Sequence, residues 1–333
     1  MIEFLLGVDG GGSGTRVRLA RADGVELASG ASGPSALSLG IAAAWAAIDD
    51  AAAKAFAEAG LPFPAKSAVA IGLGLAGVHN RQWAAAFIAA NAANAGYAEL
   101  ALESDGHTTV LGAHAGQPGA IIALGTGSVG EVKLADGRHI EMGGWGFPSG
   151  DEASGAWMGL RAANHLQQVL DGRMPANAFA DAIAGICGAG DGAPAQRRDA
   201  LQNWLAKATP TIYAQLARAV LEHGGSDPTA RAILLEAGRE VEVLANALDP
   251  SGALPIALCG GLGAPLRPYL PPAVLQRSVA PQGDSAAGAL RLIRQRLSAE
   301  ANQPSSQQPN LQPNLQQNDH PNIKNEFVAE SRK

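Results

Sequence analysis

The chain has 333 residues, of which 47% are hydrophobic and 16% are charged, so it can bury one large core or two moderate ones. Its net charge of −6 provides no basic surface to neutralise the phosphates of a nucleic acid, which we therefore exclude as a partner. The two cysteines, Cys187 and Cys259, are too few for a disulfide framework and favour a reducing compartment.

The N-terminal residues follow the pattern of a strand and lack the basic segment and cleavage site of a secretory signal. The most apolar helical stretch, residues 41–59, carries Asp49, Asp50, Lys54 and Glu58 and so cannot span a bilayer. We expect a soluble, cytoplasmic protein without a membrane partner.

Three short strands are predicted at the start of the chain. The glycine-rich segment from Asp9 to Gly14 and the pair Asp23-Gly24 separate them as tight turns would, which favours an antiparallel meander over residues 3–9, 15–22 and 25–31. Helices and strands then alternate as in an α/β layer, with a helix at 41–59, a strand at 67–73, a helix at 80–95 and a strand at 99–103.

The same pattern recurs in the second half of the chain. After a helix at 106–114, the loop Gly125-Thr-Gly-Ser128 and the turn Asp136-Gly137 separate three further strands, at 120–124, 129–134 and 138–142. The recurrence indicates two related lobes, although two unrelated hairpins would give the same pattern.

Residues 153–248 are mostly helical in pattern, with breaks at 188–194 and 224–228. A short strand at 255–259 runs into Gly260-Gly-Leu-Gly263, and a last helix is predicted at 284–297. Beyond Ser298 the chain is rich in Gln, Asn, Pro and Ser, and we expect this tail to be disordered.

The segment Asp9 to Thr15 ends one strand and begins the next. Its glycines let backbone N–H groups approach an anion, and Asp9 at the strand end can hold Mg²⁺ through water. It is no P-loop, because neither a Gly-Lys-Ser/Thr sequence nor a helix follows. A plain hairpin turn that needs glycine is the alternative.

Two segments match the G-x-G-x-x-G pattern of dinucleotide-binding proteins. The first, 125–130, is followed by a strand where that fold requires a helix. The second, 72–77, lies between a strand and a helix, with Glu103 and Asp105 near the end of the next strand. A nicotinamide-dependent enzyme is therefore a minor alternative.

Asp105 follows the predicted strand 99–103 and precedes a helix, a place where ligands collect in open α/β sheets. A carboxylate there can take the proton from a sugar hydroxyl while a phosphoryl group is transferred to it. The same position also suits an ordinary aspartate that caps the helix.

The segment 143–154 combines glycines, Trp145, Phe147, Asp151 and Glu152 ahead of a helix. This mixture suits a carbohydrate, because aromatic rings pack on the apolar face of the sugar and carboxylates accept bonds from its hydroxyls. A capped helix start with a packed Trp is the alternative. Neither cysteine has His or Cys at ligand spacing, and we treat His107 and His114 as structural or solvated.

These motifs, in this order over residues 1–297, resemble the BadF/BadG/BcrA/BcrD ATPase-type family and its N-acetylglucosamine kinase and glucosamine kinase branch. Asp9–Thr15 resembles the first phosphate loop of the family, Leu124–Ser128 the second and Leu258–Ala264 the adenosine motif. Residues 284–290 are similar to the helix that closes such kinases, and 143–154 to the segment beside the sugar.

The resemblance implies a two-lobed actin-like ATPase fold of the ribonuclease H-like type, with a mixed sheet flanked by helices in each lobe and a central cleft. The implied lobes are residues 1–117 and 118–283, with the helix 284–297 packing back towards the first and 298–333 as the disordered tail. ATP and Mg²⁺ are the implied cofactors, and a homodimer is common among such sugar kinases.

The implied roles fall on individual residues. Asp105 is the general base for the 6-hydroxyl of the sugar, and Asp9 positions Mg²⁺ through water. The ATP phosphates are held by Gly11, Gly12, Thr15, Thr126 and Gly127. Gly260, Gly261 and Leu262 line the adenosine pocket, and Ser128, Trp145 and Asp151 contact the sugar.

The expected substrate is N-acetylglucosamine, with glucosamine close behind. The asparagine that touches the sugar in N-acetylglucosamine kinases is absent from Gly33-Pro-Ser-Ala36, whereas Trp145 is absent from the glucosamine kinases. Two other activities stay open. One is an ATPase coupled to electron transfer, which would need cysteines for an iron–sulfur cluster; the other is a sugar sensor without activity.

Overall fold

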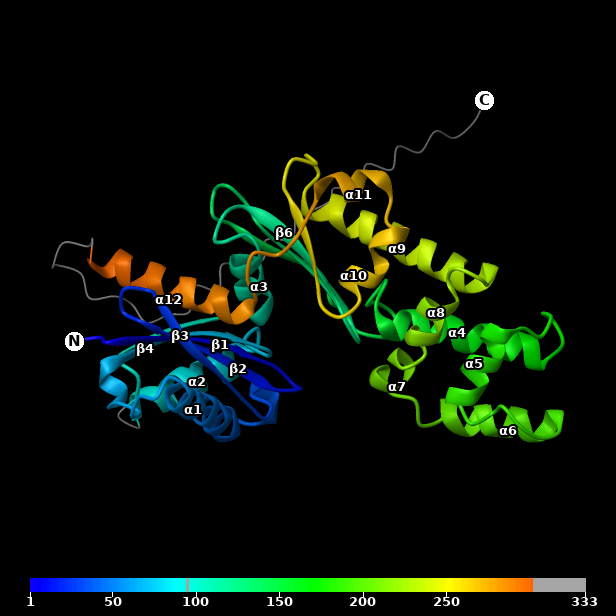
Figure 1. The fold of residues 1–333 in the computed structure, drawn as a ribbon, viewed down its shortest axis with the longest axis horizontal. Coiled ribbons are helices and arrows are strands. Elements are labelled where there is room, and N and C mark those ends of the chain that lie inside the picture. Colours follow the sequence, from blue (N-terminus) through cyan, green and yellow to red (C-terminus); the bar gives the residue numbers. More distant parts are fainter. Residues whose placement is uncertain (94–95, 302–333) are drawn as a thin grey trace, which may run out of the picture.

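The structure, a computed structural model, describes residues 1–93 and 96–301. Two sheets of five strands each form the centres of two lobes (Figure 1). The first sheet has the order β3-β2-β1-β4-β5 and the second has the order β10-β9-β6-β7-β8. The expected fold class, two α/β lobes with a mixed sheet in each, is thereby confirmed.

The first sheet begins with the predicted antiparallel meander. In it β1 pairs with β2 and β2 with β3, while β4 and β5 extend the sheet in parallel on the other side of β1. The bounds are β1 Phe4–Gly10, β2 Thr15–Arg21, β3 Glu26–Ser32, β4 Val69–Leu75 and β5 Glu99–Glu103. The predicted fourth strand began two residues early, because Lys66–Ala68 form the short 3₁₀ helix η2.

The second sheet repeats this connectivity. Its first three strands again form an antiparallel meander, and β9 and β10 add in parallel beside β6. The bounds are β6 Gly119–Leu124, β7 Ser128–Lys133, β8 His139–Gly143, β9 Ile256–Cys259 and β10 Ser278–Val279. The two lobes are therefore related in topology, and the alternative of two unrelated hairpins is wrong. The two-residue β10 was too short for any sequence pattern to indicate.

Helices cover both faces of the first sheet. The helices α1 (Ile41–Glu58) and α2 (Arg81–Ala93) pack on one face, with the 3₁₀ helix η1 (Leu37–Leu39) beside them. The last helix, α12 (Ser285–Ala301), packs on the other face, and it approaches β4 so closely that a Cβ at Gly72 would overlap the carbonyl of Ala289. Gly72 and Gly74 thus lie inside a strand that a helix covers, and this G-x-G-x-x-G match is not a dinucleotide loop.

The helix α3 (Asp105–Ala113) connects the two lobes. It packs along α12 and also contacts the second sheet, where Val110 and Ala113 meet Ile121 and Ala257 (Figure 1). A Cβ at Gly288 of α12 would overlap the carbonyl of Thr108, so glycine allows the two helices to cross in close contact. The start of α3 is therefore fixed by both lobes.

The segment between β8 and β9 is helical, and in Figure 1 its helices α4–α8 extend away from both sheets. Polar N-caps begin α4, α5, α7 and α9, since Ser154, Asn177, Thr209 and Asp227 each accept a bond from a backbone N–H in the first turn. The bounds in this segment are α4 Gly155–Leu170, α5 Ala178–Ile186, α6 Pro194–Leu205, α7 Pro210–Ala214, α8 Ala217–His223 and α9 Pro228–Leu248. Between β9 and β10 lie α10 Gly263–Leu266, η3 Arg267–Tyr269 and α11 Pro272–Arg277.

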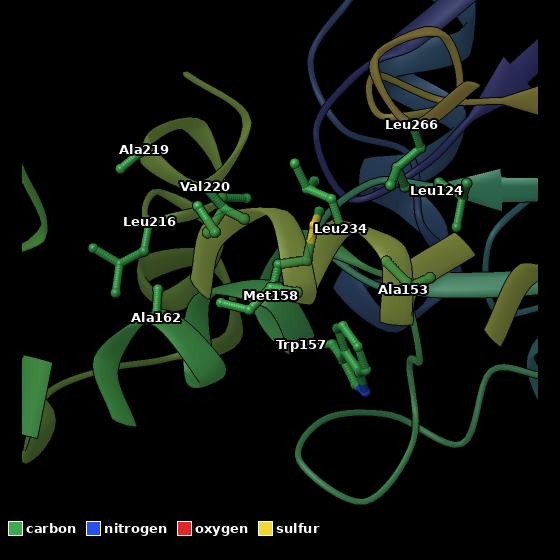
Figure 2. Close-up of a cluster of buried hydrophobic side chains, with 14 of the residues drawn as sticks. Leu124, Ala153, Trp157, Met158, Ala162, Leu216, Ala219, Val220, Leu234 and Leu266 are labelled. Carbon is green, nitrogen blue, oxygen red and sulfur yellow. The ribbon is translucent and has the colours of Figure 1, made fainter. Parts of the chain in front are cut away.

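The largest core lies between these helices and the second sheet. Figure 2 shows Trp157 and Met158 of α4 in the same cluster as Leu216 and Val220, with Leu124 at the end of β6 and Leu266 of α10 at its margin. The burial of these side chains holds α4 against the end of the sheet. The helical segment thus packs against the end of the sheet from which the β6–β7 loop projects.

The last helix is longer than predicted. It ends at Ala301 instead of 297, and an ion pair between Arg296 Nε and Glu300 Oε1 at 3.2 Å stabilises its final turn. The expected disordered tail thus begins at least four residues later than predicted, and its remainder, 302–333, lies outside the described residues. Within the described ranges, no helix has the length and apolar character needed to cross a membrane.

Candidate active site

The first glycine loop is the hairpin that joins β1 to β2. Gly11 N donates to Gly14 O at 3.0 Å, and a Cβ at Gly11 or Gly12 would have no neighbour within 4 Å. The space beside both glycines is therefore open, as it must be for a phosphate to approach the backbone.

Hydrogen bonds connect the segment 33–36 to this loop. Gly11 O accepts from Ser35 N and Ala36 N at 3.1 and 3.2 Å. The buried Thr15 Oγ1 donates to Gly33 O and lies 2.7 Å from Ser35 Oγ. The Thr15 hydroxyl is thus engaged inside the loop in this conformation, and its contact with an ATP phosphate stays a prediction. Ser35 was missed, because nothing in the sequence links it to residues twenty positions away.

Asp9 lies at the end of β1, directly before the first glycine loop. Its Oδ2 is 2.6 Å from Arg16 Nη2, and the hydrogen bond and negative charge of Asp9 raise the pKa of the Arg16 guanidinium. The described residues contain no group of three His, Cys, Asp or Glu side chains that could hold a metal ion by themselves. One carboxylate beside an open glycine loop nevertheless fits Mg²⁺, which proteins bind through one or two carboxylates together with substrate phosphates.

The second glycine loop joins β6 to β7. Gly125 N donates to Gly127 O at 2.9 Å, and the start of α4 closes over the loop, because Gly155 N donates to Gly125 O and Ala156 N to Thr126 O. Thr126 is exposed. An antiparallel strand follows, so the match at 125–130 is likewise no dinucleotide loop.

The segment 143–154 reaches the tip of this second hairpin. A Cβ at Gly127 would lie 2.7 Å from Asp151 Oδ2, and Ser128 Oγ donates to Glu152 O at 2.6 Å. Asp151 and Ala153 have φ angles of 59° and 64°, a left-handed conformation that is costly for residues other than glycine and clusters at functional sites. The Asp151 carboxylate is thus brought to the second glycine loop at the expense of backbone strain.

Trp145 is 77% exposed, so the alternative in which it packs in the core is wrong. The packed tryptophan is Trp157 of α4, and the helix start that this alternative assumed is present, because Ser154 caps α4. An exposed aromatic ring on a loop is available to a ligand.

The segment 260–262, where the adenosine pocket is predicted, lies beside the second glycine loop. Leu262 N donates to Leu124 O at 3.0 Å, which ties the end of β9 to the end of β6. Gly260 has a φ of 80° and lies against Leu124, whereas a Cβ at Gly261 would meet nothing within 4 Å. The structure thus brings 260–262 and 125–127 together from sequence positions more than a hundred residues apart.

Asp105 is the first residue of α3. The N-cap of this helix is Ser104, whose Oγ accepts from His107 N at 3.0 Å, so the alternative that Asp105 caps the helix is wrong. Burial, and secondly the negative charge of Asp9, raise the pKa of the Asp105 carboxyl. A carboxylate with a raised pKa beside a second acid and an open glycine loop is a candidate general base.

Several titratable side chains around Asp105 were not predicted as functional. His79 Nε2 in the first lobe lies 3.0 Å from Glu141 Oε2 in the second, and burial raises the pKa of Glu103 to about 7. His79, Glu141 and Glu103 come from separate elements and share no motif, so only the fold reveals them as neighbours.

The two histidines expected to be structural or solvated, His107 and His114, are half-buried and buried, respectively.

The paired sheets, the connecting helices and the loops at their ends define the class: a two-lobed α/β protein of the actin-like ATPase fold. The Thermus thermophilus ROK hexokinase has this fold, with a TM-score of 0.52 at 18% identity over 89% of this chain and 99% of that one. The model of the BadF/BadG/BcrA/BcrD ATPase family matches residues 6–292, and the chain belongs to that family.

Two relatives are much more similar to this chain in sequence than the hexokinase is. The Vibrio cholerae glucosamine kinase GspK is 31% identical over 291 residues, which cover 87% of this chain and 95% of GspK. A Chromobacterium violaceum structure provisionally described as an N-acetylglucosamine kinase is 53% identical, with a TM-score of 0.79 over 88% of this chain and 99% of that one.

Proposed function

We propose that the protein is an ATP-dependent amino-sugar kinase that transfers the γ-phosphate of ATP to the 6-hydroxyl of the sugar. The observation that carries this proposal is the placement of Asp105. Asp105 is the first residue of α3, directly after β5, and its half-buried carboxyl lies close enough to Asp9, beside the first glycine loop, for that charge to raise its pKa further. Membership in an ATPase family and the likeness to two amino-sugar kinases support the same activity.

The proposed mechanism depends on positioning and charge. ATP with Mg²⁺ supplies the phosphoryl group. Gly11, Gly12 and Gly127 would offer backbone N–H groups to the phosphates, and Asp9, at the end of β1, would hold the Mg²⁺ through water. Asp105 takes the proton from the 6-hydroxyl as the oxygen bonds to the γ-phosphorus and the bond to the β-phosphate oxygen breaks. A modestly basic carboxylate suffices, because the transition state is loose.

The proposed substrate is N-acetylglucosamine, with glucosamine as the close competitor. Trp145, an exposed ring, Asp151, held at the second glycine loop, and Ser128, whose hydroxyl donates to Glu152 O, would contact the sugar. The relatives do not decide between the two sugars, since one is a glucosamine kinase and the other carries the N-acetylglucosamine description.

An ATPase that couples hydrolysis to electron transfer is the weaker candidate. Cys187 is buried in the helical core and Cys259 lies in β9, so the two thiols belong to separate clusters and do not form a pair that could share an iron–sulfur cluster. Magnesium dependence, a cytoplasmic location and a homodimeric assembly stay predictions.

The test is ATP turnover by the purified full chain with Mg²⁺ and each of four sugars: N-acetylglucosamine, glucosamine, N-acetylmannosamine and glucose. We expect turnover that depends on one of the two glucosamine sugars and disappears when EDTA removes the metal. ATP hydrolysis that is the same without sugar would refute the kinase and favour the ATPase, and the absence of any turnover would favour a sensor.

A further inference from the structure

Gly106, the residue after Asp105, occupies an unexpected place for glycine. It lies in the first turn of α3 with an ordinary helical backbone, where alanine would favour the helix by up to about 1 kcal/mol. A Cβ at this position would overlap Glu131 Oε1. In this conformation the carboxyl group of Glu131, from the other lobe, fills the space that a side chain at 106 would occupy.

Glu131 lies in the middle of β7, between Ile121 of β6 and Glu141 of β8, and is only 3% exposed. Its Oε2 is 3.3 Å from His139 Nδ1. Burial, and then the carboxylates of Glu141, Asp105 and Glu103, raise the pKa of Glu131 well above its usual value. A neutral carboxyl group can fill this site without adding negative charge beside Asp105.

His139 links this contact to the next residue of α3. Its ring stacks on that of His107 with 4.0 Å between centroids, and His107 Nδ1 lies 3.9 Å from Glu103 Oε2. Burial, reinforced by the nearby Lys133, lowers the pKa of His107 to about 4 and that of His139 to about 3, so both rings are neutral. The first turn of α3 is thus enclosed by Glu131 and His139 of the second lobe and by Glu103 of the first.

We propose that Glu131 and His139 are positioning residues, which clamp the turn of α3 formed by Asp105, Gly106 and His107 and so aim the Asp105 carboxylate at the sugar hydroxyl. This inference rests on the proposed role of Asp105. A clamp is needed because α3 connects two lobes, and a displacement of about 1 Å at a reacting group can lower a rate about 100-fold. Neither residue touches the substrate in this role.

The experiment is a double-mutant cycle on kinase turnover, with Gly106→Ala, Glu131→Ala and the double variant in the full chain. Each single variant should lower kcat between about 10- and 100-fold, because the turn that carries Asp105 shifts, while KM for ATP stays nearly constant. The double variant should recover much of the loss, because the methyl group added by Gly106→Ala gains room when the carboxyl group of Glu131 is removed. Glu131→Gln, which keeps the shape and polarity, should lose far less than Glu131→Ala.

Gly185→Ala is the matched control. Gly185 is also a helical glycine, in α5, but a Cβ there would meet nothing within 4 Å, so kcat should not change. Thermal melting of every variant separates a shifted turn from an unfolded protein. If Glu131→Ala does not fold, Gly106→Ala alone still tests the clamp, since it should fold and turn over slowly.

Unchanged kcat in Gly106→Ala, or losses that simply multiply in the double variant, would overturn the clamp. Asp105→Ala in the same assay keeps this failure distinct from that of the proposed function. If Asp105→Ala retains turnover, the general base is misassigned; if it loses turnover while Glu131→Ala does not, only the clamp is refuted.

Discussion

The two glycine hairpins occupy equivalent places in two sheets of the same topology, yet different contacts hold them in place. The β1–β2 loop is open beside Gly11 and Gly12 and rests on the segment 33–36 through Thr15 and Ser35. The β6–β7 loop is covered, because Asp151 lies against Gly127 and the start of α4 bonds to Gly125 and Thr126.

The charges also differ between the two lobes. The acids predicted to act in catalysis, Asp9 and Asp105, both belong to elements of the first half of the chain, whereas the carboxylate at the second hairpin, Asp151, is predicted to contact the sugar. The same topology thus carries the two acids of the predicted phosphoryl transfer in one lobe and, in the other, the loop predicted to contact the sugar. The predictions below test this division, beginning with the largest effect.

Replacing Asp105 by alanine should abolish most turnover. General-base catalysis contributes about 10²- to 10⁴-fold, and the hairpins that would hold ATP are unaffected, so ATP binding should stay close to that of the wild type. Steady-state kinetics and calorimetric ATP titration measure the two quantities. Turnover within a few-fold of the wild type would mean that the first lobe does not supply the base.

The glycines of the two hairpins should respond differently to alanine. In Gly127→Ala the new Cβ would lie 2.7 Å from Asp151, so both the melting temperature and the affinity for sugar and ATP should fall. Gly12→Ala has free space, so its melting temperature should hold while only ATP binding weakens. Melting curves of Gly127→Ala and Gly12→Ala with and without ATP measure both effects. Equal melting temperatures of the two variants would show that the first loop is not open and the second covered in the way described.

Thr15→Val should destabilise the first hairpin without touching the second. The change leaves Ser35 and Gly33 O without their buried partner, at a cost of about 1–3 kcal/mol in the free energy of unfolding. Urea denaturation gives this quantity, with Thr15→Ser as the control that retains the hydroxyl. If Thr15→Val leaves the free energy of unfolding unchanged, the hydrogen bonds between Thr15 and the segment 33–36 do not determine the conformation of the loop.

The smallest expected effect concerns the pair His79–Glu141, which joins the lobes. The hydrogen bond to Glu141 raises the pKa of His79 above 6.5, so the stability it contributes is present below that pH and is lost as the pH rises through the raised pKa. Because His79 is more than half exposed, we expect less than about 1 kcal/mol. The wild type and His79→Gln should therefore differ in melting temperature at low pH and converge at high pH; a constant difference would exclude the ion pair.

Much of the fold could be predicted from local sequence. Alternating apolar residues and Asp-Gly turns placed the strands of both meanders within one or two residues, and the order of the glycine motifs indicated the family. The G-x-G-x-x-G match at 72–77 shows the limit, since Gly72 and Gly74 serve the packing of α12 and α3 against β4. The end of α12 was also misplaced, since the helix continues to Ala301 through a last turn that contains the ion pair of Arg296 with Glu300.

The sequence by itself determined the strands, most helices and the short segments that carry the chemistry, because turn residues and hydrophobic period act over a few neighbouring positions. Only the tertiary structure decided that Ser35 would brace the first glycine loop, that Asp151 would reach Gly127 and that Glu131 would fill the space beside Gly106. These contacts join residues up to tens of positions apart, and no local pattern encodes which two elements will face one another. The environment of Asp105 is therefore a property of the fold, while Asp105 itself could be found in the sequence.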